Sequence, residues 1–247
     1  MVNLKSFAFA LAALALTCVG AGSAGAQTSQ PAPTRPIVNA PPPINAPALI
    51  GSAPAAESVR AAADRLAMRG QVSAERLAQA NADNPWTPWV AMHPVFGDGF
   101  SEERLPRTAR VFADVLQGLS PAIGAAKNAN SRPRPLIADP SVLRCDALDP
   151  AVAAQSSFPS GHGAGGWAWA LVLAELVPSR ADAILQRGRD FGDSRVICGY
   201  HYPSDIEAGR TIAAGVIARL HADASFRRDL DAARAELARA YPRPDSR

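Results

Sequence analysis

Residues 163–177 read GAGGWAWALVLAELV, and this stretch is apolar on every side until Glu175. A helix without a polar face is expected at the centre of a bundle rather than on its surface. Around it, the spacing of apolar residues favours helices from residue 57, from residue 73, and over 181–190, 204–222 and 224–240. No convincing strand alternation and no internal repeat accompanies them. The sequence therefore predicts an all-α fold: a single compact helical bundle domain with a central buried helix.

The segment before this helix gives less regular signals. Residues 84–100 contain three prolines and two glycines, and we expect a loop whose aromatic side chains pack over the body. A helix is expected from Ser101, interrupted near Pro106, followed by a further helical stretch over 121–129.

Composition limits the class of protein. The chain has 247 residues, of which 48% are hydrophobic and 19% charged, and this excludes a wholly disordered chain. The formal net charge is only +3 and the basic residues do not cluster. A nucleic acid polymer is therefore not an expected partner.

The N-terminus has the pattern of a secretory signal peptide over residues 1–26. Lys5 supplies the positive charge, an apolar run covers 7–16, and Ala24-Gly25-Ala26 is a small-residue cleavage site. The alternative is a retained anchor. Cleavage after Ala26 predicts a periplasmic or secreted protein without stable membrane insertion.

Seven prolines within 27–50 predict a flexible arm over 27–52, which leaves 53–247 for the helical domain.

Two cysteines, Cys145 and Cys198, remain after removal of the signal peptide. In an oxidising compartment an even pair favours one disulfide, and two buried free thiols are the alternative.

Three short segments carry the polar chemistry: KNANSRPRP at 127–135, FPSGH at 158–162 and SRVICGYHYPSD at 194–205. Lys127 would be the only lysine of the mature chain. Arginine offers planar paired donors suited to phosphate oxygens, and lysine offers a compact charge. The second segment opens the buried helix, whose N-terminus favours an anion. Together the segments predict a phosphate site.

His201 precedes Asp205 by four residues. If a helix begins near Pro203, the carboxylate can reach back to the imidazole, fix its tautomer and leave the other ring nitrogen free to attack. His162 can then protonate a leaving oxygen. His93 and His221 are expected to be ordinary packing or capping residues. The sequence contains no HExxH, carboxylate cluster or CxxC, so no metal and no cofactor are expected.

The combination K-x6-RP, PSGH and SR-x5-H-x3-D resembles the three-part signature of the type 2 phosphatidic acid phosphatase superfamily. Within it, FPSGH, ALVLAEL and SRVICGYH are similar to the bacterial class A non-specific acid phosphatases, which are secreted or periplasmic, all-helical and metal-independent. The resemblance spans roughly residues 55–240.

The resemblance implies a role for each residue of the site. His201 would be the nucleophile that forms a phosphohistidine, Asp205 would orient it, and His162 would be the general acid and then the base. The phosphoryl oxygens would be held by Lys127, Arg134, Ser160, Gly161 and Arg195. The implied substrates are small phosphate monoesters, and the implied assembly is a homodimer or a larger homo-oligomer.

Two positions depart from the usual class A motif SYPSGHT: Phe158 replaces the tyrosine and Gly163 replaces the threonine. The second change removes a hydroxyl beside the acid histidine.

Two alternatives share the signature or its phosphate site: a vanadium-dependent haloperoxidase on the same scaffold, and a non-catalytic phosphate-binding protein. The acid phosphatase hypothesis predicts a bell-shaped pH profile of activity with an acidic optimum.

Overall fold

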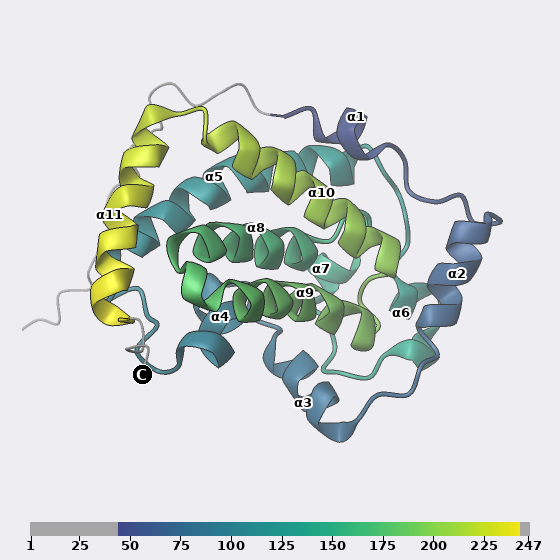
Figure 1. The fold of residues 1–247 in the computed structure, drawn as a ribbon. Coiled ribbons are helices and arrows are strands. Elements are labelled where there is room, and N and C mark those ends of the chain that lie inside the picture. The colour runs from purple at the N-terminus through teal and green to yellow at the C-terminus, as the bar shows by residue number, and fades with distance from the viewer. Residues whose placement is uncertain (1–43, 243–247) are drawn as a thin grey trace, which may run out of the picture. The chain divides into compact units, whose positions relative to one another are not determined.

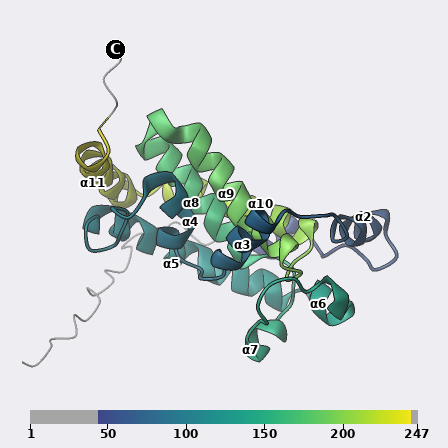
Figure 2. The ribbon, with the colours of Figure 1, turned by 90° about the horizontal axis from the view of Figure 1, so that it is seen from below.

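The computed structural model describes residues 44–242, and it is helical without strands over that range (Figure 1, Figure 2). The helices are α1 (Ala46–Ile50), α2 (Val59–Ala67), α3 (Ala74–Ala82), α4 (Pro88–Phe96), α5 (Pro106–Asn128), α6 (Pro135–Ala138), α7 (Pro150–Ala153), α8 (Gly161–Leu176), α9 (Ala181–Ile197), α10 (Pro203–Leu220) and α11 (Ala224–Ala240). The prediction of an all-α fold is confirmed. The signal peptide expected over 1–26 and most of the expected arm lie outside the described residues.

Helix α8 is the central buried helix that its sequence predicts. It packs against α9 and α10, and Figure 1 shows it between them. Trp169 and Leu173 of this helix are fully buried in the main hydrophobic core. The three helices approach closely because glycines face one another: a Cβ at Gly188 of α9 would lie 2.8 Å from the carbonyl oxygen of Gly166. Small residues in α8 thus serve helix contact as well as burial.

The structure corrects two expectations for the segment before α8. Residues 84–100 are not wholly a loop, because α4 begins at Pro88, where a proline fits the first turn, and the Thr87 side chain caps it. The break expected near Pro106 is the start of α5, which continues as one helix through Pro121 to Asn128. Proline removes one backbone donor, but the buried face of α5 continues on both sides of Pro121 and holds the helix together.

The described end of the expected arm is ordered. Asn45 caps α1, Ala46 is fully buried, and Ile44 and Ile50 pack against the main core. Helix α1 contacts α5 and α10. The flexible arm expected up to residue 52 therefore does not extend over residues 45–50.

The turn between α9 and α10 positions the last sequence motif. Gly199 adopts a positive φ of 82°, and a Cβ there would lie 2.3 Å from the carbonyl oxygen of Val142. Cys198, beside it, forms a disulfide with Cys145. The turn is thus fastened to the loop between α6 and α7, and Figure 2 shows these two short helices projecting on one side of the bundle. No helix between residues 44 and 242 is long and apolar enough to cross a membrane.

Candidate active site

The three motifs meet at one cavity of about 340 Å³. Six of the predicted residues line it: Lys127, Arg134, Gly161, His162, Arg195 and His201. They come from the end of α5, the start of α6, the start of α8, the end of α9 and the turn before α10. Its other lining residues are Trp86, Ser120, Ile123, Gly124, Leu148, Val152 and Gln155.

His201 lies against the carboxylate that the spacing predicts. Asp205 is in the first turn of α10, where its Oδ2 accepts a hydrogen bond from the Tyr202 backbone N–H at 2.8 Å. The same oxygen lies 3.4 Å from Nδ1 of His201, and both side chains are buried. The Ser157 hydroxyl donates to this oxygen at 2.5 Å and lies 3.4 Å from Nδ1. Ser157 is a site residue that sequence reasoning missed, although it stands directly before the FPSGH motif.

The other ring nitrogen of His201 faces a cation. Nη1 of Arg134 lies 3.0 Å from Nε2, and because a guanidinium can only donate, Nε2 is the acceptor and carries a lone pair. Burial, together with the charges of Arg134 and Lys127, lowers the pKa of His201 to about 3 despite the hydrogen bond with Asp205. The imidazole is therefore neutral at mildly acidic pH.

Arg132 joins the carboxylate of Asp205 to a second buried acid. Its guanidinium lies 2.7 Å from Oδ1 of Asp205 and 2.7 Å from Oδ2 of Asp64, which belongs to α2. Asp64 also accepts a hydrogen bond at 3.0 Å from the backbone N–H of Ser204, in the first turn of α10. Burial alone would raise the pKa of Asp205, but its hydrogen bond with His201 and the charge of Arg132 lower it.

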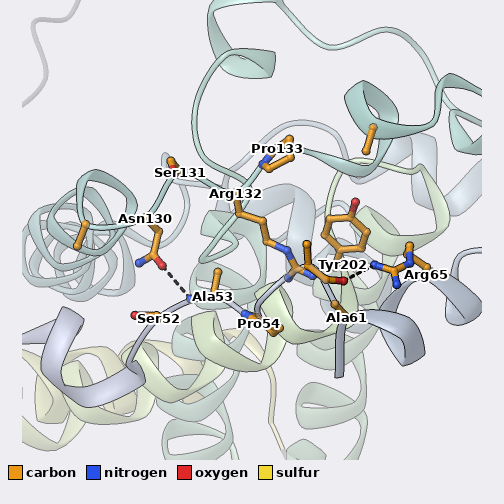
Figure 3. A pocket seen from close by; sticks show the side chains of 13 residues that line it. Ser52, Ala53, Pro54, Ala61, Arg65, Asn130, Ser131, Arg132, Pro133 and Tyr202 are labelled. Carbon is orange, nitrogen blue, oxygen red and sulfur yellow. Dashed lines mark hydrogen bonds between the residues drawn. The ribbon is translucent and has the colours of Figure 1, made fainter. Parts of the chain in front are cut away.

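Arg132 lines a second cavity, of about 480 Å³, together with the rest of the loop at 130–133 and the segment before α2 (Figure 3). Figure 3 shows its side chain beside Tyr202, and the guanidinium carbon lies 4.0 Å from the centre of that ring. In the same view Asn130 accepts a hydrogen bond from the backbone of Ala53. The segment before α2 is thus tied to the loop that carries Arg132.

Three cations line this cavity: Lys127, Arg134 and Arg195. Nζ of Lys127 donates to the Ser156 carbonyl at 2.5 Å, and burial, followed by the charge of Arg134, lowers the pKa of Lys127 to about 8. Arg195 is only 2% exposed, and burial lowers its pKa to about 10. Its Nη2 donates to Oδ1 of Asn84 at 3.0 Å, whereas its Nε and Nη1 have no hydrogen-bond partner among residues 44–242. Two donors of this buried cation thus lack a partner in the described part of the chain, and the residue itself lines the cavity.

His162 is held by the same asparagine. Its Nε2 lies 3.0 Å from the Asn84 carbonyl oxygen, which can only accept, so Nε2 carries a proton. The ring stacks on Phe191 at 5.2 Å. Burial and the charge of Arg195 hold the pKa of His162 well below its usual value. Asn84 therefore orients both His162 and Arg195, and no local signal in the sequence marks it.

The start of α8 differs in part from its predicted role. Ser160 is fully buried and its Oγ accepts the Gly163 N–H at 3.2 Å, which makes it the helix cap. It is not among the residues that line the cavity, whereas Gly161 is. A Cβ at Gly163 would lie 3.0 Å from the carbonyl oxygen of Ile206 in α10. A side chain at position 163 would therefore press on the backbone of α10.

The two remaining histidines lie elsewhere. His93 is exposed and lies 2.9 Å from Asp98, and His221 lies 2.8 Å from Glu175. Within residues 44–242, no group of three or more His, Cys, Asp or Glu side chains is placed to hold a metal ion.

Together, the helical bundle and this cavity define a protein that can bind a phosphoryl group beside a neutral histidine. Residues 111–229 match the family model of the PAP2 superfamily. The matched residues include all three sequence motifs.

Curated relatives carry phosphatase names. The chain is 44% identical over 137 residues to an acid phosphatase of Zymomonas mobilis, a match that covers 56% of this chain and 52% of that protein. It is 38% identical over 151 residues to a non-specific acid phosphatase of Providencia stuartii, covering 60% of each. It is 38% identical over 146 residues to one of Salmonella typhimurium, covering 58% of each. The matched stretches thus span 52% to 60% of the length of these relatives.

Proposed function

We propose that the protein is an exported, metal-independent acid phosphatase that hydrolyses small organic phosphomonoesters through a phosphohistidine. One arrangement carries the proposal: His201 lines a cavity together with Arg195, a buried cation with two unpartnered nitrogens within residues 44–242, and Nε2 of His201 accepts a hydrogen bond from Arg134, which a bound phosphoryl group would replace. Arg134 and Lys127 border the same cavity. A phosphoryl group bound there would lie between a nucleophile and three cations. The names of the relatives support the same activity.

The reaction takes two steps. In the first, Nε2 of His201 attacks phosphorus, the ester P–O bond breaks, and His162 gives a proton to the leaving alcohol oxygen. In the second, His162 takes a proton from water, the water oxygen attacks phosphorus, and the N–P bond breaks to release inorganic phosphate. Asp205 and Ser157 hold Nδ1 throughout. Lys127, Arg134 and Arg195 stabilise the charge on the phosphoryl oxygens in both transition states.

The protonation states set the working pH. His201 must be neutral, and its pKa of about 3 makes it so above that pH. His162 must be protonated, and its lowered pKa places this condition on the acid side of neutrality. A bound phosphate dianion adds negative charge beside His162 and raises its pKa in the complex. The need for a protonated His162, whose pKa is lowered by burial and by the charge of Arg195, together with a neutral His201, supports an acidic optimum.

Export is supported by the signal peptide pattern at residues 1–26 and by the disulfide between Cys145 and Cys198, a bond typical of oxidising compartments. The resemblance to class A phosphatases supports a homodimer or a larger assembly, which sedimentation of the purified protein would measure.

The first test is hydrolysis of p-nitrophenyl phosphate at about pH 5–6, in the histidine range, with EDTA present. We expect EDTA-resistant turnover in the wild type, its loss in His201→Ala, and its retention in His93→Ala, an exposed histidine outside the cavity. Loss of turnover with EDTA, or activity retained in His201→Ala, would contradict the proposal. Peroxide-dependent oxidation of bromide with added vanadate would instead favour the haloperoxidase.

A further inference from the structure

The catalytic cavity has an apolar wall that the phosphoryl chemistry does not use. Trp86, Ile123, Leu148 and Val152 line it together with the cations, and no carboxylate is among its lining residues. This wall adjoins the place where the ester oxygen must leave, because His162 lines the same cavity. The surface next to the leaving group is therefore apolar and aromatic.

Exposed hydrophobic side chains gather at this opening. Within residues 44–242, six large hydrophobic side chains are exposed. Trp86, at 36%, and Val152, at 40%, line the catalytic cavity. Ile137, at 55%, lines an adjoining cavity that shares Lys127 and Arg134 with it. Clustered apolar surface on a soluble domain marks a binding site, whereas single exposed residues do not.

The fold holds the Trp86 ring in place. A Cβ at Gly165 of α8 would lie 2.4 Å from Nε1 of Trp86, so the missing side chain makes room for the indole. The ring centre of Trp86 lies 6.0 Å from that of the fully buried Trp169. Trp86 also follows Asn84 by two residues, and Asn84 bonds both His162 and Arg195. The indole is thus fixed relative to the reacting groups.

We propose that this apolar wall receives the organic group of the substrate, so that the protein prefers phosphate monoesters of aromatic or aliphatic alcohols to those of polyols. Trp86 is the residue that determines this preference. The inference rests on the proposed function, because it assigns the substrate class of the same site. An aromatic contact and the burial of apolar surface give a preference of about tenfold or more.

A binding experiment tests the preference without turnover. Benzylphosphonate and 2-hydroxyethylphosphonate cannot be hydrolysed, and calorimetry gives the Kd of each. We expect the wild type to bind benzylphosphonate about tenfold more tightly. Trp86→Ala should bring the two Kd values together, Trp86→Phe should keep most of the difference, and Gly165→Ala should reduce it by displacing the indole. Leu66→Ala, an exposed residue of α2 remote from the cavity lining, should leave the ratio unchanged.

Kinetics supply the second arm. Benzyl phosphate and glycerol 1-phosphate both release primary alcohols, so their kcat/KM ratio reports recognition more than leaving-group reactivity. Trp86→Ala should raise KM for benzyl phosphate with little change in kcat, and the Ki of inorganic phosphate should stay within about twofold of the wild-type value, because its cationic contacts remain. Equal weakening of both phosphonates, or no preference in the wild type, would overturn the inference. A wild type that binds benzylphosphonate selectively but hydrolyses neither ester would overturn the proposed function alone.

Discussion

Arg195 lines the same cavity as His201, and its buried guanidinium group has two nitrogens without a hydrogen-bond partner in the described part of the chain. Leaving such donors unmet costs folding free energy, so their retention needs an explanation. Binding an anion provides one. A cation–π contact with Tyr200 offsets part of the free energy lost on burying the charge: the ring centre lies 4.2 Å from the guanidinium carbon.

Arg195→Gln should lower kcat/KM by about 10²–10³-fold, the usual effect of removing a donor that stabilises transition-state charge. The free energy of unfolding should change little, because within residues 44–242 the wild-type side chain makes a single hydrogen bond, to Asn84. Arg189→Gln, an exposed position on the same helix, serves as the matched control. Activity in Arg195→Gln within a few-fold of that control would contradict the assigned role.

Lys127→Gln should raise the pKa of His201. The positive charge of Lys127 disfavours the imidazolium, so its removal stabilises the protonated form, and the pKa rises from about 3. Nuclear magnetic resonance titration of the labelled histidines measures this directly, with exposed His93 as the internal reference. An unchanged or lower His201 pKa would show that Lys127 does not act on the nucleophile electrostatically.

The sequence motifs predict which cations and histidines meet, because each motif carries its chemistry within a few residues. They do not predict Asn84 or Asp64, whose partners lie 78 and 140 residues away in the chain. Contacts at such separation depend on how the helices pack. Ser157 stands between these cases: its place beside a motif is visible, but its bond to Asp205 is not.

At the scale of elements, α2 is tied to the catalytic end of α10 through Asp64. This carboxylate bonds Arg132 and also caps the start of α10 at Ser204. The nearby pair between Arg60 and Glu207 joins the same two helices, but both side chains are exposed. Buried and exposed ion pairs on one helix therefore allow a direct comparison.

Asp64→Ala should lower the free energy of unfolding by about 3–5 kcal/mol, since it leaves a buried guanidinium with one partner fewer. Arg60→Ala should lower it by less than about 1 kcal/mol, because water screens the exposed pair. Urea unfolding of the two variants measures both values. Equal effects would mean that Asp64 is no more important to the fold than a surface charge.

The helices themselves follow closely from the sequence where the apolar pattern is regular. The central helix α8 and the amphipathic α11 are examples. The predictions that the structure corrects, for α4 and α5, were wrong at prolines. Pro88 stands at the first helical position of α4, and Pro121 lies inside α5, where burial on the neighbouring helices outweighs one lost hydrogen bond. Local rules treat both prolines as breaks because they do not include tertiary packing.

At the scale of the whole domain, the disulfide joins the turn before His201 to the loop before α7; this loop supplies Leu148 to the cavity, and α7 supplies Val152. The two cysteines are 53 residues apart, and cross-linking a loop of that length stabilises the folded state by about 4 kcal/mol in the chain-entropy account. The same bond also restrains the wall of the cavity.

The double variant Cys145→Ala and Cys198→Ala should therefore lose about 4 kcal/mol in the free energy of unfolding. Denaturant unfolding measures this, and the wild type treated with a reductant should show a similar loss. A variant as stable as the oxidised wild type would show that the bond does not support the fold.

The central claim is that His201 carries the phosphoryl group between the two steps, and trapping that group tests it most directly. His162→Ala should still be phosphorylated by p-nitrophenyl phosphate, because nitrophenolate leaves without a proton, but it should react slowly with water for lack of a base. After alkaline quenching, mass spectrometry of the digested protein should find an acid-labile phosphoryl group on His201. A phosphoryl group on another residue, or steady release of phosphate with no labelled protein, would contradict the account.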